Sequence, residues 1–200
     1  MESKRRTQTE RTAATRGALV AAGRRLWAER GYADVGTPEI AAAAGVTRGA
    51  MYHQFADKAA LFAEVAEVVE SGVTARLGEY VAASGARDPA AALHAAVDGW
   101  LAACEEPEVR QVLLLDGPVV LGWDGFRDMA LRHGLGLTEG MLRAAIEAGQ
   151  MERQPTLALA HVLIGALDEG AMYLATAEDR GAARDEVAAV LHSLLDGLMR

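Results

Sequence analysis

Apolar side chains recur every three or four positions along most of this chain, which is the period of an α-helix with one buried face. Only five prolines are present, and alternation of apolar and polar residues is almost absent, which argues against strands. We therefore predict an all-α protein of about nine helices, with a three-helix unit at residues 1–60 and a larger helical unit at residues 61–200. The helices are expected at residues 9–30, twice between 37 and 56, then at 57–84, 89–106, 109–115, 124–148, after Pro155, and at 183–199.

Two short helices joined by a tight turn are predicted between residues 37 and 56. Thr37 is expected to cap the first, with Pro38 at its first position, where the missing N–H is no loss. Gly45 ends that helix because glycine tolerates the left-handed conformation, Val46 plugs the core between the helices, and Thr47 caps the next one. The buried stripe of the first helix is predicted to comprise Ile40, Ala43 and Ala44.

The second short helix starts at Arg48 and divides its residues between two faces. Apolar Ala50, Met51 and Phe55 are expected to face inward. The opposite face is polar, aromatic and basic, which suits the major groove of DNA, and it comprises Arg48, Gly49, Tyr52 and His53. The spacing of the whole segment is typical of a DNA-reading helix-turn-helix.

This segment resembles the DNA-binding domain of TetR-type (tetracycline repressor-like) transcriptional regulators. The resemblance begins with the residues LWAERGY at positions 26–32 and covers roughly the first third of the chain. The other matching positions are Thr37, Ile40, Ala41, Ala44, Gly45, Val46, Thr47, Gly49, Tyr52, Phe55, Lys58 and Leu61. Ala50-Met51 and Gln54 depart from the family pattern, which leaves the operator sequence open.

The resemblance implies a sequence-specific transcriptional regulator, a ligand-released repressor that binds a pseudopalindromic operator as a homodimer. Its two recognition helices would enter successive major grooves about 34 Å apart. Arg48 is the predicted base reader, and Tyr52, His53 and Lys58 match family positions that contact backbone phosphates. A core position for Tyr52 and an inert surface position for His53 are the alternatives. The predicted DNA contacts are Thr37, Thr47, Arg48, Gly49, Tyr52, His53 and Lys58.

The net charge of −8 is distributed unevenly. Residues 1–60 carry ten basic and six acidic side chains, a net charge of +4, which leaves −12 on the remainder. A basic head on an acidic body attracts phosphate at one end and repels it elsewhere, so the asymmetry favours double-stranded DNA as the partner of the head. A basic cluster near the N-terminus could form an arm along the DNA or a solubilising tail; it comprises Lys4, Arg5 and Arg6.

The last two predicted helices carry apolar residues on more than one stripe, which is more than the core of one chain needs. The resemblance implies that the surplus forms a dimer interface, because regulators of this family pair through a bundle of their last two long helices. A purely intramolecular core is the alternative. The predicted interface residues are Leu163, Leu167, Leu191, Leu194, Leu195 and Leu198.

The resemblance also implies an effector cavity among the fifth to eighth predicted helices. Large or polarisable side chains there are candidates to line it, and we expect a small, mostly apolar effector. An inward carboxylate at Asp168 would favour a cationic or hydrogen-bonding ligand, while a surface or interface role is the alternative. The candidates, each of which could instead be ordinary core, are Trp100, Cys104, Trp123, Met129, His133, Met141, Asp168, Met172 and Tyr173.

Other classes of function find little support in the sequence. The five histidines show no metal-binding spacing, Cys104 is the single cysteine, and no nucleotide-binding loop or nucleophile elbow is present. We therefore expect no catalytic residue, metal or cofactor. Because the chain has no run of 18 apolar residues and no signal-peptide core, a cytoplasmic location is expected. A helical-bundle enzyme or ligand carrier, and a repressor without small-molecule control, are the competing hypotheses.

Overall fold

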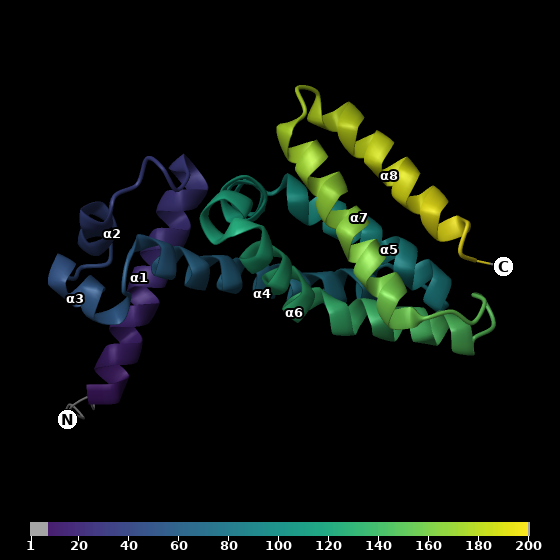
Figure 1. Ribbon diagram of the computed structural model, residues 1–200, viewed down its shortest axis with the longest axis horizontal. Helices are drawn as coiled ribbons and strands as arrows, with labels where there is room; N and C mark the ends of the chain where they lie inside the picture. The colour runs from purple at the N-terminus through teal and green to yellow at the C-terminus, as the bar shows by residue number, and fades with distance from the viewer. Residues whose placement is uncertain (1–7, 200) are drawn as a thin grey trace.

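Helices joined by short loops make up residues 8–199, which are the residues that the computed structural model describes (Figure 1). Eight α-helices and one π-helix follow one another within this range, which confirms the predicted all-α class. The predicted sixth helix is the π-helix, η1. The elements are α1 (Gln8–Arg30), α2 (Thr37–Ala43), α3 (Arg48–Gln54), α4 (Lys58–Ala83), α5 (Pro89–Glu105), η1 (Val109–Asp116), α6 (Gly117–Glu147), α7 (Thr156–Thr176) and α8 (Arg180–Asp196).

Helices α1, α2 and α3 pack with the start of α4 into a small head (Figure 1). Its core centres on three aromatic rings in edge-to-face contact: the Phe62 ring lies 5.3 Å from that of Trp27 and 5.1 Å from that of Tyr32, centre to centre. Ile40 of α2 and Met51 of α3 are fully buried in the same core. These contacts hold α2 and α3 in place, because helices of two turns are not stable alone.

The turn between α2 and α3 follows its sequence prediction. Gly45 has a φ of 68°, in the left-handed region that glycine tolerates. The Thr47 side chain accepts a 3.1 Å hydrogen bond from the backbone N–H of Ala50, which makes Thr47 the N-cap of α3. Val46 is partly buried against the core.

The start of α2 differs from its prediction. The N-cap is Gly36, whose backbone is extended, and Thr37 is already inside the helix, so Thr37 does not cap it. The buried residues of α2 are Thr37, Ile40 and Ala41, whereas Ala43 is exposed. Of the predicted stripe, Ile40 is buried and Ala44 is partly buried against the core, so Ala43 is the residue that the prediction misplaced.

Helix α4 is shared by the head and the body, and Figure 1 shows it running from one to the other. Near its start, Leu61 and Phe62 are fully buried in the head core, and Glu64 pairs with Arg16 of α1 at 2.6 Å. Its second half lies against α5 and α6 in the body. The predicted boundary between the two units, at residue 60, therefore falls inside α4, and the head and the body share this helix.

A second connection joins the head to η1 and the start of α6. The backbone N–H of Tyr32 donates to the Asp116 carboxylate at 2.8 Å, and Arg24 of α1 pairs with Glu108 through two bonds of 2.5 and 2.7 Å. The body then closes with α5, α6, α7 and α8 around a second buried core (Figure 1). The head is thus held by α4 on one side and by η1 on the other.

Two helix boundaries in the body differ from prediction. The break before the helix predicted at residues 124–148 lies at Gly122, whose non-helical φ of 71° and ψ of 166° kink α6, and not at Pro118, which is already in the first turn of α6. Helix α8 begins at Arg180, three residues before its predicted start, because the side chain of Asp179 caps it. Helix α8 also ends at Asp196, three residues before its predicted end, so it is shifted along the chain and not lengthened.

Candidate DNA-binding face and ligand cavity

Helix α3 presents a polar and aromatic face to solvent. Met51 on its inner side is fully buried, whereas Tyr52 is 42% exposed and so is not a core residue. The division between the two faces of α3 is therefore the one that the sequence predicted. The exposed residues on this face are Thr47, Arg48, Gly49, Tyr52 and His53.

A hydrogen bond joins the two helices of the motif beside this face. The hydroxyl oxygens of Thr37 and Tyr52 are 3.3 Å apart, and the guanidinium carbon of Arg48 lies 5.5 Å from the centre of the Tyr52 ring. The hydrogen bond with Thr37 and the nearby Arg48 hold the pKa of Tyr52 below its usual value. Thr37 itself is buried, so its hydroxyl serves to orient Tyr52.

Lys58 is more constrained than the residues on α3. Its ammonium donates to the carbonyl oxygen of Tyr32 at 2.5 Å and lies 3.9 Å from the centre of that ring. Burial lowers the pKa of Lys58, and the charge of Asp116 acts in the opposite direction. A phosphate would use the other N–H donors of the ammonium. The predicted basic arm lies outside the described residues and comprises Lys4, Arg5 and Arg6.

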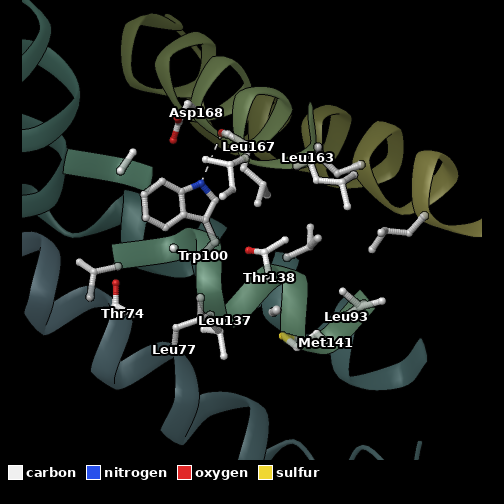
Figure 2. Close-up of a pocket in the computed structure, with 18 of the residues that line it drawn as sticks. Thr74, Leu77, Leu93, Trp100, Leu137, Thr138, Met141, Leu163, Leu167 and Asp168 are labelled. Carbon is white, nitrogen blue, oxygen red and sulfur yellow. Dashed lines mark hydrogen bonds between the residues drawn. The ribbon is translucent and has the colours of Figure 1, made fainter. Parts of the chain in front are cut away.

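The body contains a cavity between α4, α5, α6, α7 and α8 (Figure 2). The cavity has a volume of about 90 Å³. The ring of Trp100 forms part of the wall, and its indole N–H donates to the carbonyl oxygen of Leu167 at 3.3 Å. The remaining wall is mostly apolar, and its polar side chains are Glu70, Thr74, Thr138 and Asp168.

Three of the predicted effector residues line this cavity, namely Trp100, Met141 and Asp168. Side-chain size was the signal for the prediction, and size does not determine which way a residue of a helix points. The other six lie elsewhere: Cys104 and Met129 are buried in the core, His133 and Met172 are partly buried, and Trp123 and Tyr173 are exposed.

The cavity residues of α4 are absent from the sequence prediction. Glu70, Thr74 and Leu77 line the cavity, but the sequence suggested only a mechanical role for this helix. One signal was present: Glu70 interrupts an otherwise apolar buried stripe that includes Val69 and Val73. A carboxylate on the buried face of a helix needs a partner or a function.

Two carboxyl groups line the cavity, and one of them has a counter-charge. Asp168 accepts a 3.2 Å hydrogen bond from Arg127, which also donates to the carbonyl oxygen of His161 at 2.9 Å. Burial raises the pKa of Asp168 to about 6, although Arg127 acts in the opposite direction. Among the described residues Glu70 has no hydrogen bond or ion pair, and burial, with the charge of Asp168, raises its pKa to about 7.

Helices α7 and α8 expose a second apolar surface, which we call the outer face. It comprises Val162 and Tyr173 of α7 and Val190 and Leu194 of α8, with side chains between 49% and 67% exposed. Helix α7 is also the one described helix that is long and apolar enough to cross a membrane. Because α7 packs against α5, α6 and α8, its apolar character serves the core on one side and the outer face on the other.

The outer face differs from the predicted dimer surface. Leu191 and Leu195 are 5% and 3% exposed and belong to the core of their own chain, while Leu194 is exposed. The prediction combined two stripes of α8 that lie about 100° apart on the helix. The remaining predicted residues are partly buried and pack against the core of their own chain; they are Leu163, Leu167 and Leu198.

Two family models match the chain. The model of bacterial regulatory proteins of the tetR family matches residues 19–65, and that of the tetracyclin repressor-like C-terminal domain matches residues 90–198. A solved TetR-family transcriptional regulator from Pectobacterium atrosepticum is 32% identical, with a TM-score of 0.86 over 97% of this chain and 98% of that one. RolR in complex with the ligand resorcinol is 21% identical, with a TM-score of 0.75 over 94% of this chain and 90% of that one.

Curated relatives match shorter stretches. The HTH-type transcriptional regulator CymR of Pseudomonas putida is 41% identical over 76 residues, which are 38% of this chain and 37% of the relative. AcrR of Shigella flexneri is 44% identical over 59 residues, 30% of this chain and 27% of the relative. The chain belongs to the TetR family of transcriptional regulators, whose members bind operator DNA and function as dimers. Within residues 8–199, no three His, Cys, Asp or Glu side chains are placed to hold a metal ion.

Proposed function

We propose that this protein is a ligand-released repressor that binds a pseudopalindromic operator as a homodimer. The observation that carries the proposal is the exposed face of α3, where Arg48, Tyr52 and His53 stand on the surface of a head whose residues are net basic. Arg48 is suited to hold a guanine through two parallel hydrogen bonds. Tyr52, His53 and Lys58 are suited to fix the register of the head through backbone phosphates.

The outer face is the proposed dimer interface. A contiguous apolar patch exposed on one chain is costly unless something covers it, and a second copy would present the same patch about a two-fold axis. The head lies at the far end of the molecule from α8 (Figure 1). Pairing through α7 and α8 would therefore leave both α3 helices free to enter successive major grooves, about 34 Å apart.

The cavity is the proposed effector site. It is mostly apolar with a few polar groups, as small-molecule sites generally are. Its volume of about 90 Å³ is smaller than the about 150 Å³ of an engineered apolar cavity that holds benzene, so a ligand of even one ring requires the surrounding helices to move apart. RolR, which has a similar fold, was solved with resorcinol, a single-ring molecule.

Two connections lead from the cavity to the head. Helix α4 carries Thr74 at the cavity and Leu61 in the head core, so a shift of α4 moves both. Helix α6 follows Asp116, which accepts from the N–H of Tyr32, and the carbonyl of Tyr32 in turn accepts from Lys58. A ligand that fits one arrangement of α4 and α6 better than the other would change the separation of the two heads.

Selection of duplexes from a random-sequence pool with the purified chain tests this function. We expect an enriched inverted repeat, because a two-fold symmetric dimer reads two half-sites. Enrichment of no common sequence would contradict operator binding. A ligand that occupies the cavity should then weaken operator binding, and the operator should weaken ligand binding by the same factor. A cavity ligand that leaves operator affinity unchanged would contradict ligand release.

A further inference from the structure

Three glutamates of α4 lie on successive turns, and their surroundings differ. Glu64 pairs with Arg16 at 2.6 Å, and Glu67 contacts Arg132 and accepts from His133 at 2.6 Å. Glu70 follows one turn later, is 7% exposed, and lines the cavity. Among the residues of the described chain, it alone of the three makes no hydrogen bond or ion pair.

Among the described residues no group forms an ion pair with Glu70, although the charge of nearby His133 favours its ionisation. Glu67 on its own helix is already paired, and His133 of α6 is engaged with Glu67. Asp168 of α7 is a second carboxyl group, and its Arg127 is held by Asp168 and by a backbone carbonyl. Helix α5 contributes the buried thiol of Cys104 nearby, and the lining residues of α8 are leucines.

We propose that the cavity binds a small, ring-bearing organic monocation, such as a protonated primary arylalkylamine, and that Glu70 is the carboxylate that receives its ammonium group. This inference rests on the proposed role of the cavity as the effector site and names the class of ligand. An ammonium donates three hydrogen bonds and supplies a positively charged partner, which Glu70 lacks within the described chain. The same cavity disfavours an anion, because Glu70 and Asp168 both face it.

The wall of the cavity fits the rest of such a ligand. Leu77, Leu93 and Leu163 surround the space, and the Trp100 ring borders it (Figure 2). An aromatic face attracts a cation as well as an apolar ring. The hydroxyl groups of Thr74 and Thr138 can accept the N–H bonds that Glu70 leaves free.

The protonation of Glu70 gives this site a pH dependence. Its pKa of about 7 means that a proton neutralises the carboxyl group below neutral pH, when no cation is bound. An ammonium ligand must displace that proton. Affinity for a cation should therefore increase by about tenfold between pH 6 and pH 8, because the ionised fraction of Glu70 rises by that factor.

Isothermal titration of the full chain with three probes tests the proposal: benzylamine, benzyl alcohol and benzoate. At pH 8 we expect benzylamine to bind at least about tenfold more tightly than benzyl alcohol, since hydrogen bonds to charged groups contribute more than neutral ones. Glu70→Gln should remove this preference and the pH dependence while benzyl alcohol binding stays within about twofold. Glu67→Gln removes a paired glutamate one turn away and should leave the preference intact.

Several outcomes would overturn the proposal. Equal or tighter binding of benzyl alcohol or benzoate, unchanged benzylamine binding by Glu70→Gln, or no binding of any probe would each contradict a cation site at Glu70. Measuring operator binding by the ligand-free chain distinguishes a failure of the cation site from a failure of the proposed function. A chain that binds its operator but not benzylamine remains a repressor without this ligand class, whereas one that binds benzylamine but selects no duplex has the cation site without operator recognition.

Discussion

The head and the body both carry acidic side chains, but the two regions place them in different surroundings. In the head, Arg16 and Glu64 form an ion pair whose side chains are 40% and 38% exposed. In the body, Glu70 and Asp168 are 7% and 6% exposed, and of these two only Asp168 has a counter-charge. An exposed pair contributes at most about 1 kcal/mol, whereas a buried unpaired carboxyl group costs several times more.

This difference corresponds to the two kinds of partner. The negative charge of DNA is spread along its backbone, so a head that binds it needs exposed hydrogen-bond donors and no enclosed pocket. A small ligand must be enclosed to be recognised, so the polar groups that recognise it are buried before it arrives. The body is therefore expected to be less stable than its packing would allow until its ligand is bound.

The largest expected effect comes from Leu194→Glu on the outer face. Leu194 is 49% exposed in the single chain, so a glutamate there should leave the chain folded but place a charge in the proposed dimer interface. We expect a monomer by sedimentation velocity. Operator affinity should fall by about 10²–10⁴-fold, because each head then binds its half-site alone.

Two variants of α8 make that result specific. Ala189→Glu adds the same charge at an exposed position outside the outer face and should leave the dimer intact. Leu195→Glu, at a residue 3% exposed, should instead reduce the thermal stability of the chain, because it buries a charge in the core. If Leu194→Glu remained a dimer with unchanged operator affinity, the outer face would not be the dimer interface.

Glu70→Gln should stabilise the body above neutral pH. The carboxyl group has an ordinary value of 4.5 and a pKa of about 7 in the fold, so unfolding releases its proton between these values. Stability is therefore lost as pH rises from about 4.5 to about 7 and stays lower above that range. At pH 8 the glutamine variant should unfold with about 3 kcal/mol more free energy than the wild type, as measured with urea.

The same experiment at pH 4.5 supplies its own control. There the wild-type carboxyl group is protonated in the fold, so the two proteins should have similar stability. Glu67→Gln should show no comparable gain at pH 8, because that glutamate has Arg132 and His133 as partners. Equal stabilisation at both pH values would mean that packing, and not ionisation, distinguishes Glu70 from glutamine.

The head was easier to predict from sequence than the body, for a physical reason. The cap at Thr47, the left-handed Gly45 and the division of α3 into two faces depend on residues within one or two turns. The cavity depends on which sides of five helices face one another, which local spacing does not determine. Trp123 is as large as Trp100 but is 59% exposed, and Glu70 gave only the weak signal of an acid in an apolar stripe.

In the head, Arg48→Ala should chiefly reduce discrimination between sequences. Loss of a bidentate contact to guanine costs about 1–3 kcal/mol at one base pair and leaves non-specific binding largely intact. Lys58→Ala should instead weaken operator and random duplex alike and reduce the salt dependence of binding. Fluorescence anisotropy on both duplexes at two salt concentrations measures these effects. Reversal of the two patterns would overturn the assignment of base reader and phosphate contact.

The smallest effect is expected from Tyr52→Phe, which removes one hydroxyl and keeps the ring. That hydroxyl is 3.3 Å from the hydroxyl of buried Thr37 and is the proposed phosphate donor. Its loss should cost about 1 kcal/mol, roughly a fivefold weakening that is equal for operator and random duplex, because a phosphate contact carries no sequence information. Thr37→Val removes the orienting partner but keeps the donor, so it should weaken DNA binding less than Tyr52→Phe. If Tyr52→Phe instead lowered operator affinity alone, Tyr52 would contact a base, and the polar face of α3 would read more of the operator than Arg48 does.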